Sequence, residues 1–248
     1  MDYRPITVRA RIGMIIPASN RLVEPQLNRH APDGVVVHLT RLRMTGQYHK
    51  PIADLLPDIA DAAGTLSDAR CDPIVFQCTG TAMQEGVEAE RGIVRKIESA
   101  TGCRASTTAS ATMAAFEALG ARRIVVVSPY PRETHEHELA FLTEAGIEIV
   151  GERSLGLSGS DAYCSAPPAL WLDTVAAVQD DRADAYFVSC ANIHSIDVID
   201  EMEAEMDRPV VTSNQVALWH GLRLAGIQDS IAGLGKLLTV QIAEAVAA

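Results

Sequence analysis

Short runs of apolar residues, many of them β-branched, recur along the chain and alternate with longer stretches whose apolar positions follow a helical repeat. The short runs are continuous rather than alternating, which is typical of strands buried on both faces of a parallel sheet. We predict strands at residues 12–17, 35–39, 73–77, 124–128, 147–152, 185–189 and 210–212. We predict helices at residues 52–69, 87–101, 109–119, 133–144, 169–179 and 195–205. This order indicates an α/β fold with helices on both faces of the sheets.

The order of strands and loops repeats within the chain. Each half begins with a strand that ends in a proline-containing loop, and each half later has a strand that ends in a cysteine loop. Asn20 and Cys78 are 58 residues apart in the first half, and Tyr130 and Cys190 are 60 apart in the second. The repeat predicts two similar Rossmann-like domains with parallel sheets, related by a pseudo-two-fold axis, with the active site in the cleft between them.

The predicted domain boundaries follow from this repeat. The N-terminal α/β domain takes residues 1–108 plus 214–248, and the second α/β domain takes residues 109–213. Ser213 and Asn214 follow the last predicted strand, and helix capping is the role we expect of them.

Composition narrows the classes of function. The chain has 248 residues and a formal net charge of −11, which disfavours nucleic acids and anionic membranes as partners. No apolar run is long enough for a membrane span, and the first residues lack a signal-peptide pattern, so we expect a cytoplasmic protein. The five cysteines have no CxxC spacing, so we expect neither a disulfide framework nor a metal site.

Two of the five cysteines stand out by their position. Ligands of open α/β sheets bind at the carboxyl ends of strands, where Cys78 and Cys190 are both predicted to lie. A thiol at the start of a helix is expected to have a lowered pKa. A thiolate and a thiol that face each other can move protons on and off carbon, or add to a double bond. For Cys71, Cys103 and Cys164 we expect simple burial.

Several segments together resemble a known family. They are residues 11–20 (RIGMIIPASN), 38–44 (HLTRLRM), 128–130 (SPY), 153–159 (RSLGLSG) and 189–191 (SCA). Their order over nearly the whole chain resembles the aspartate/glutamate racemase superfamily, and within it the maleate cis-trans isomerase and arylmalonate decarboxylase group.

The resemblance implies roles for particular residues. Cys78 matches the nucleophile or first acid/base, and Cys190 matches the second. Asn20 and Tyr130 match residues that bind a substrate carboxylate. Three further positions match loop residues whose backbone N–H groups, and in one case the hydroxyl, hold that carboxylate: Thr79 (with its hydroxyl), Gly80 and Ala191. Such a site needs no cofactor and no arginine, because amide donors can bind the anion.

The chain also departs from the family pattern. Ser160 stands where the isomerases carry a further asparagine, and Asn192 and His194 make the second cysteine loop more polar, which points to a different substrate. Cys78 stands where the decarboxylases have glycine, so the resemblance implies a two-cysteine mechanism. His49 and Lys50 lie in a polar stretch that is either a solvated loop or a lid.

The expected function is therefore a cofactor-independent isomerase of a small carboxylate or dicarboxylate, similar to maleate isomerase. The alternatives are a decarboxylase of an arylmalonate-like acid, an amino-acid or hydantoin racemase, and a non-catalytic carboxylate sensor. The resemblance also implies a homo-oligomer.

Overall fold

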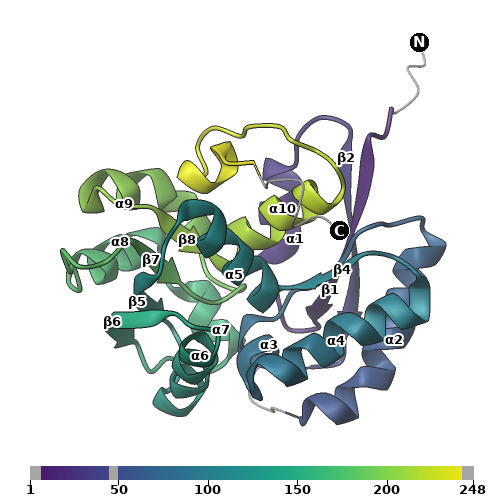
Figure 1. The fold of residues 1–248 in the computed structure, drawn as a ribbon, viewed down its shortest axis with the longest axis horizontal. Helices are drawn as coiled ribbons and strands as arrows, with labels where there is room; N and C mark the ends of the chain where they lie inside the picture. The colour runs from purple at the N-terminus through teal and green to yellow at the C-terminus, as the bar shows by residue number, and fades with distance from the viewer. Residues whose placement is uncertain (1–6, 45–49, 242–248) are drawn as a thin grey trace.

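The computed structural model describes residues 7–44 and 50–241, and it contains two four-stranded sheets whose neighbouring strands are all parallel (Figure 1). The first sheet has the order β2-β1-β3-β4, and the second has the order β6-β5-β7-β8. The strands are β1 (Ala10–Pro17), β2 (Val35–Leu42), β3 (Ile74–Phe76), β4 (Ala105–Thr107), β5 (Arg123–Ser128), β6 (Glu148–Ser154), β7 (Ala185–Val188) and β8 (Val210–Thr212). The two orders are identical when counted from the first strand of each half, which confirms the predicted repeat.

Helices cover both sheets, and six of them overlap the six predicted segments. They are α1 (Val23–His30), α2 (Ile52–Asp68), α3 (Thr79–Met83), α4 (Gly86–Thr101), α5 (Thr108–Leu119), α6 (Arg132–Glu144), α7 (Gly159–Ser165), α8 (Pro168–Ala176), α9 (Ile199–Met206) and α10 (Ser213–Leu224). Two 3₁₀ segments, η1 (Ser195–Val198) and η2 (Lys236–Thr239), complete the elements. Helices α1, α3, α7 and α10 and strand β4 have no counterpart among the predicted segments. Helices α3 and α7 and strand β4 are too short to show a hydrophobic period, and all 12 residues of α10 are buried, so this helix has no exposed polar face.

Helices α5 and α10 pack against each other in the middle of the molecule, between the two halves (Figure 1). Phe116 of α5 packs edge-on against Phe187 of β7, with ring centroids 6.1 Å apart. Gly221 of α10 lies over β1, where a Cβ atom would come 3.1 Å from Ile12 Cγ2. The helix that follows each sheet's last strand therefore packs on the other sheet. The boundaries at 108/109 and 213/214 stay a prediction.

The same local chemistry starts both exchanged helices. Thr107 ends β4 and caps α5, and Thr212 ends β8 and caps α10. Each threonine side chain accepts from a backbone N–H three residues later, and the side chain at that position (Ser110 or Gln215) bonds back to the cap. These capping boxes turn the chain directly from strand to helix. The expectation of a cap at Ser213 or Asn214 is therefore wrong by one residue, because the last strand residue already does this work.

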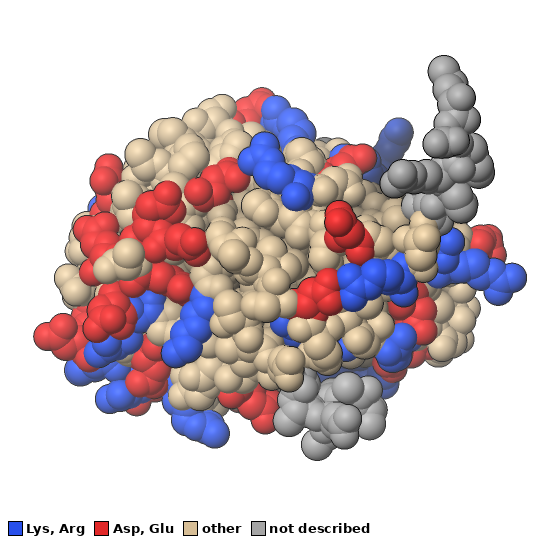
Figure 2. Space-filling model, turned by 90° about the horizontal axis from the view of Figure 1, so that it is seen from above, with Lys and Arg blue, Asp and Glu red and all other residues tan. Residues whose placement is uncertain are grey.

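No helix within residues 7–44 and 50–241 is long and apolar enough to cross a membrane. On the face shown in Figure 2, acidic side chains gather toward the side of the molecule where α9 lies. That helix carries Asp200, Glu201, Glu203 and Glu205, and it accounts for part of the surplus negative charge.

Candidate active site

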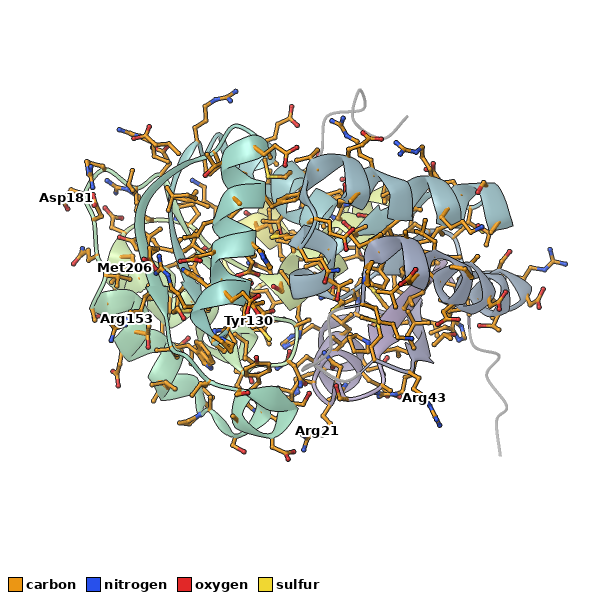
Figure 3. All side chains as sticks on the ribbon, turned by 90° about the horizontal axis from the view of Figure 1, so that it is seen from below. Arg21, Arg43, Tyr130, Arg153, Asp181 and Met206 are labelled. Carbon is orange, nitrogen blue, oxygen red and sulfur yellow. The ribbon has the colours of Figure 1, made fainter. Side chains whose placement is uncertain are left out.

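A cavity of about 400 Å³ lies where the carboxyl ends of the strands in the two halves meet. Each half contributes loops to its wall, as expected for open parallel sheets. All nine residues predicted for the site line it: Asn20, Cys78, Thr79, Gly80, Tyr130, Ser160, Cys190, Ala191 and Asn192. Figure 3 shows Tyr130 and Arg21 close to the boundary between the halves.

Two further candidate residues, His194 and Lys50, do not line this cavity. His194 is absent from the cavity lining and instead bonds through Nδ1 to Asp197 at 3.2 Å. Lys50 is exposed, and its carbonyl accepts a hydrogen bond from Gln84 Nε2 at 2.8 Å. His49 lies outside the described residues, so the lid stays a prediction.

Cys78 follows β3 and caps α3, as the pattern predicted. Its thiol donates to Thr81 Oγ1 over 3.3 Å, one turn into the helix. Burial raises the pKa of Cys78, and the contact with Thr81 only partly opposes the rise. The expectation of a lowered pKa is therefore wrong, because desolvation of the thiolate outweighs the field of a five-residue helix.

Cys190 follows β7, but the chain turns before the 3₁₀ segment at Ser195 instead of starting a helix at once. Its backbone has φ of 106°, in the left-handed region that a side chain rarely adopts. Two hydrogen bonds hold this conformation: Cys190 N–H donates to Ser213 Oγ at 3.0 Å, and Asn192 N–H donates to Cys190 Sγ at 3.4 Å. With this backbone conformation, Cys190 lines the cavity.

The Cys190 thiol is also deeply buried, and burial raises its pKa to about 12. The hydroxyl of Tyr130 acts against this rise through a hydrogen bond to the sulfur. A thiol in this state is a proton donor at neutral pH rather than a thiolate.

Two tyrosines pack together beside Cys190. The rings of Tyr130 and Tyr163 meet edge to face, with centroids 5.7 Å apart and an interplanar angle of 80°. The carbonyl of Tyr130 accepts from Ser154 Oγ at 2.6 Å and from Gly156 N–H at 3.1 Å, which fixes the loop after β5. Burial raises the pKa of both hydroxyls, so both remain neutral donors. The sequence pattern did not single out Tyr163.

Asn20 and Asn192 tie the loops of the two halves together. Asn20 Oδ1 accepts from the N–H groups of Leu22 and Val23 at the start of α1, and its amide donates to Ala191 O at 3.0 Å. Asn192 Oδ1 accepts from Arg21 N–H at 2.9 Å. Both side chains reach the cavity while bridging the halves, so the site is complete only when the halves are closed on each other.

A buried network of side-chain amides supports these loops on the side away from the cavity, and the sequence pattern does not predict it. Asn214 donates to Ala191 O at 3.1 Å and also to Gln26 Oε1. Gln77 donates to Asn214 Oδ1 at 2.9 Å and to Ser213 O at 3.0 Å. The only available signal was the polar residues that directly follow the buried strands β3 and β8.

Ser213 has a different role from the expected cap. Its hydroxyl accepts from Thr79 Oγ1 at 2.9 Å and from the Cys190 N–H. The serine thereby links the two cysteine loops. With the Thr79 hydroxyl committed to Ser213, the backbone N–H of Thr79 is the group left for a ligand.

The cavity is lined mainly by uncharged polar groups. Among the described lining residues, Glu133 is the one acidic side chain and none is Lys, Arg or His, and the rest offer hydroxyls, amides, thiols and backbone groups. The described residues contain no cluster of three or more His, Cys, Asp or Glu placed to hold a metal ion. The arrangement can bind a small anion through dipoles and present a thiol to it from each half.

A repeated α/β half, with one cysteine loop from each copy at a shared cavity, agrees with the expected membership of the aspartate/glutamate racemase superfamily. The model of the arylmalonate decarboxylase family matches residues 12–238, and the chain belongs to that family.

Similar proteins include both activities of the group. A maleate isomerase of Pseudomonas putida is 26% identical over 242 residues, which cover 92% of this chain and 97% of that protein. An arylmalonate decarboxylase of Bordetella bronchiseptica is 26% identical over 217 residues, covering 87% and 90%. The crystal structure of a maleate isomerase variant from Pseudomonas putida S16 with maleate superposes with a TM-score of 0.87 at 26% identity, covering 93% of this chain and 97% of that one.

Proposed function

We propose that the protein is a cofactor-independent isomerase of a small dicarboxylate, of the maleate isomerase type, in which Cys78 and Cys190 carry the chemistry. The observation that carries this proposal is that a cysteine from each half lines one cavity. The prediction of an isomerase agrees with the similarity of the chain to maleate isomerases. The cavity volume of about 400 Å³ suits a small acid.

The proposed cycle uses the two thiols in turn. Cys78 first loses its thiol proton to solvent. The thiolate then forms an S–C bond to one carbon of the double bond, and the electron pair moves onto the adjacent carbon and its carboxylate. Cys190 gives its thiol proton to that carbon, and the C–C bond, now single, rotates. The Cys190 thiolate then takes a proton back from the same carbon, the S–C bond breaks, and the double bond re-forms. No proton or electron is consumed overall.

The contacts of the two cysteines support Cys190 as the proton donor and Cys78 as the nucleophile. Cys190 contacts the Tyr130 hydroxyl and stays protonated, as the proton donor must. Cys78 lies beside Thr81, whose hydroxyl can rotate to donate to the sulfur as charge develops. The backbone N–H groups of the two cysteine loops are the donors that we expect to hold the substrate carboxylate and its enediolate-like form.

A second candidate is decarboxylation of an arylmalonate-like acid. It is favoured by the match to the decarboxylase family model and by the protonated Cys190 thiol, which can deliver a proton to a carbanion after carbon dioxide leaves. The presence of Cys78 on the opposite side of the cavity speaks for the isomerase instead.

A substrate screen by NMR in D₂O tests the proposal. We expect a cis-dicarboxylate to be converted to its trans isomer, with deuterium entering the carbon that Cys190 serves. An arylmalonate that loses carbon dioxide would identify the second candidate. Deuterium exchange at the α-carbon of an amino acid would identify a racemase, and ligand binding without turnover would identify a sensor.

Cysteine variants test the assigned roles. Cys78→Ala and Cys190→Ala should each lose turnover while the circular dichroism spectrum is unchanged. Cys103→Ala is the matched control, because Cys103 lies outside the cavity, where its thiol contacts Cys71 O at 3.3 Å. Full activity in the Cys190→Ala protein would contradict the two-cysteine scheme.

A further inference from the structure

A buried carboxyl group lies behind the cavity and has no part in the proposed cycle. Glu138 of α6 is fully buried and is not among the residues that line the cavity. Its Oε1 accepts a hydrogen bond from Ser189 Oγ, and Ser189 directly precedes Cys190. Its Oε2 has no hydrogen-bond partner among the described residues. A single hydrogen bond is little support for an ionised carboxylate at this depth.

The groups that Glu138 faces are those of the site itself. A negative charge on Glu138 raises the pKa of Cys78, at the start of α3, and of Cys190, after β7. It acts in the same direction on Tyr130, after β5, and Tyr163, in α7. Helix α6 also packs against α4 and β6. The ionic groups at that side of α6, Arg132 and Glu152, pair with each other at 2.7 Å rather than with Glu138.

The carboxyl therefore titrates within the working range of an enzyme. Burial raises the pKa of Glu138 to about 8, and the Ser189 hydroxyl partly offsets the rise. Below that pH Glu138 is neutral and does not oppose a negative charge on a cysteine thiolate in the cavity. Above it, a second negative charge beside the thiols would oppose thiolate formation.

We infer that Glu138 is a positioning residue that works in its uncharged form and that its ionisation restrains the two cysteines from becoming thiolates. It acts through the thiols and does not touch substrate. Its consequence for turnover rests on the proposed function, but its effect on the thiols can be measured with no substrate present.

The test is the pH dependence of alkylation of each thiol by iodoacetamide, read by mass spectrometry of the separate peptides of the full chain. At pH 9 the Cys78 peptide of Glu138→Gln should react faster than that of the wild type, by about tenfold for each unit by which the thiol pKa falls. At pH 6.5 the two proteins should react alike, because Glu138 is neutral in both. Glu136→Gln is the control, since Glu136 is exposed on the same helix.

The outcomes separate cleanly. Equal profiles for wild type and Glu138→Gln, or slower alkylation of Glu138→Gln at pH 9, would overturn the inference. If Glu138→Gln does not fold, Ser189→Ala is the variant to test. Removing the Ser189 hydrogen bond should raise the pKa of Glu138 further, so the thiols of Ser189→Ala should be alkylated faster than those of the wild type near pH 8.5. Equal alkylation rates would refute the inference. Because alkylation is measured without substrate, its result tests the role of Glu138 independently of the substrate screen that tests the proposed function.

Discussion

Asn214 is the residue whose loss should most clearly reveal how the two halves are joined. In Asn214→Ala, Ala191 O keeps its bond from Asn20, and the Gln77 amide keeps its bond to Ser213 O. Gln26 Oε1 alone loses the one partner the structure gives it. An orphaned buried acceptor costs about 1–3 kcal/mol, and each lost hydrogen bond adds about 0.5–1.5 kcal/mol. Allowing for local relaxation, we expect a loss of about 2–4 kcal/mol in the free energy of unfolding.

Urea unfolding measures this loss, with Trp171 and Trp219 as fluorescent reporters, because both are fully buried. Asn28→Ala, on the exposed side of α1, is the matched control and should change stability by less than about 0.5 kcal/mol. The double variant Gln26→Ala, Asn214→Ala removes the orphan, so it should cost about 1–2 kcal/mol less than the sum of the single variants. A loss below about 0.5 kcal/mol for Asn214→Ala, or strict additivity of the pair, would refute the reasoning.

Two further predictions concern α10. Gly221→Val should destabilise the protein by about 1–3 kcal/mol in the same assay, because the added carbons would press on Ile12. Gly64→Ala is the control and should be stabilising, because a Cβ atom at Gly64 in α2 would meet nothing within 4 Å. Unchanged stability of Gly221→Val would contradict the close packing. Burial lowers the pKa of His220 to about 4, so the folded chain stays neutral there while the unfolded chain gains a proton below about pH 6.5, and stability falls as the pH drops from 6.5 to 4. His220→Gln should flatten that part of the stability–pH curve, the exposed His137→Gln should leave it unchanged, and equal slopes for wild type and His220→Gln would rule out the assignment.

The sequence predicted the long apolar strands and the amphipathic helices, but it missed short elements and the fully buried helix α10. Strands such as β1 and β5 are runs of apolar residues that only a doubly covered sheet accommodates, so their pattern predicts them. Strand β4 reads Ala-Ser-Thr, and its polar side chains are satisfied by α4, α5 and α10 instead of being buried among apolar groups. Nothing local distinguishes such a segment from a loop, because the pairing with β3 that makes it a strand is a tertiary property.

The candidate site divides in the same way. Residues next to strand ends could be placed in the cavity because parallel strands bring their carboxyl ends together. Tyr163 could not be placed, since it comes from the short helix α7, whose position depends on packing against Tyr130. The pKa values of the two thiols could also not be predicted from the sequence. A helix start predicts a lowered pKa, but the depth of burial, which raises it, is known only once both halves are in place.

The exchange of helices explains why the site and the junction between the halves depend on the same residues. Helix α10 leaves the second sheet at Thr212 and packs on the first sheet, so its first residues cross the boundary beneath both cysteine loops. Ser213 therefore bonds both Thr79 and the Cys190 N–H, and Asn214 bonds both Gln77 and Ala191 O. A relative movement of the halves would break the bonds that cross between them, Ser213 to Thr79 and Asn214 to Ala191 O. The thiols are thus held in position by the same contacts that keep the halves closed, which ties the integrity of the cavity to the stability of the fold.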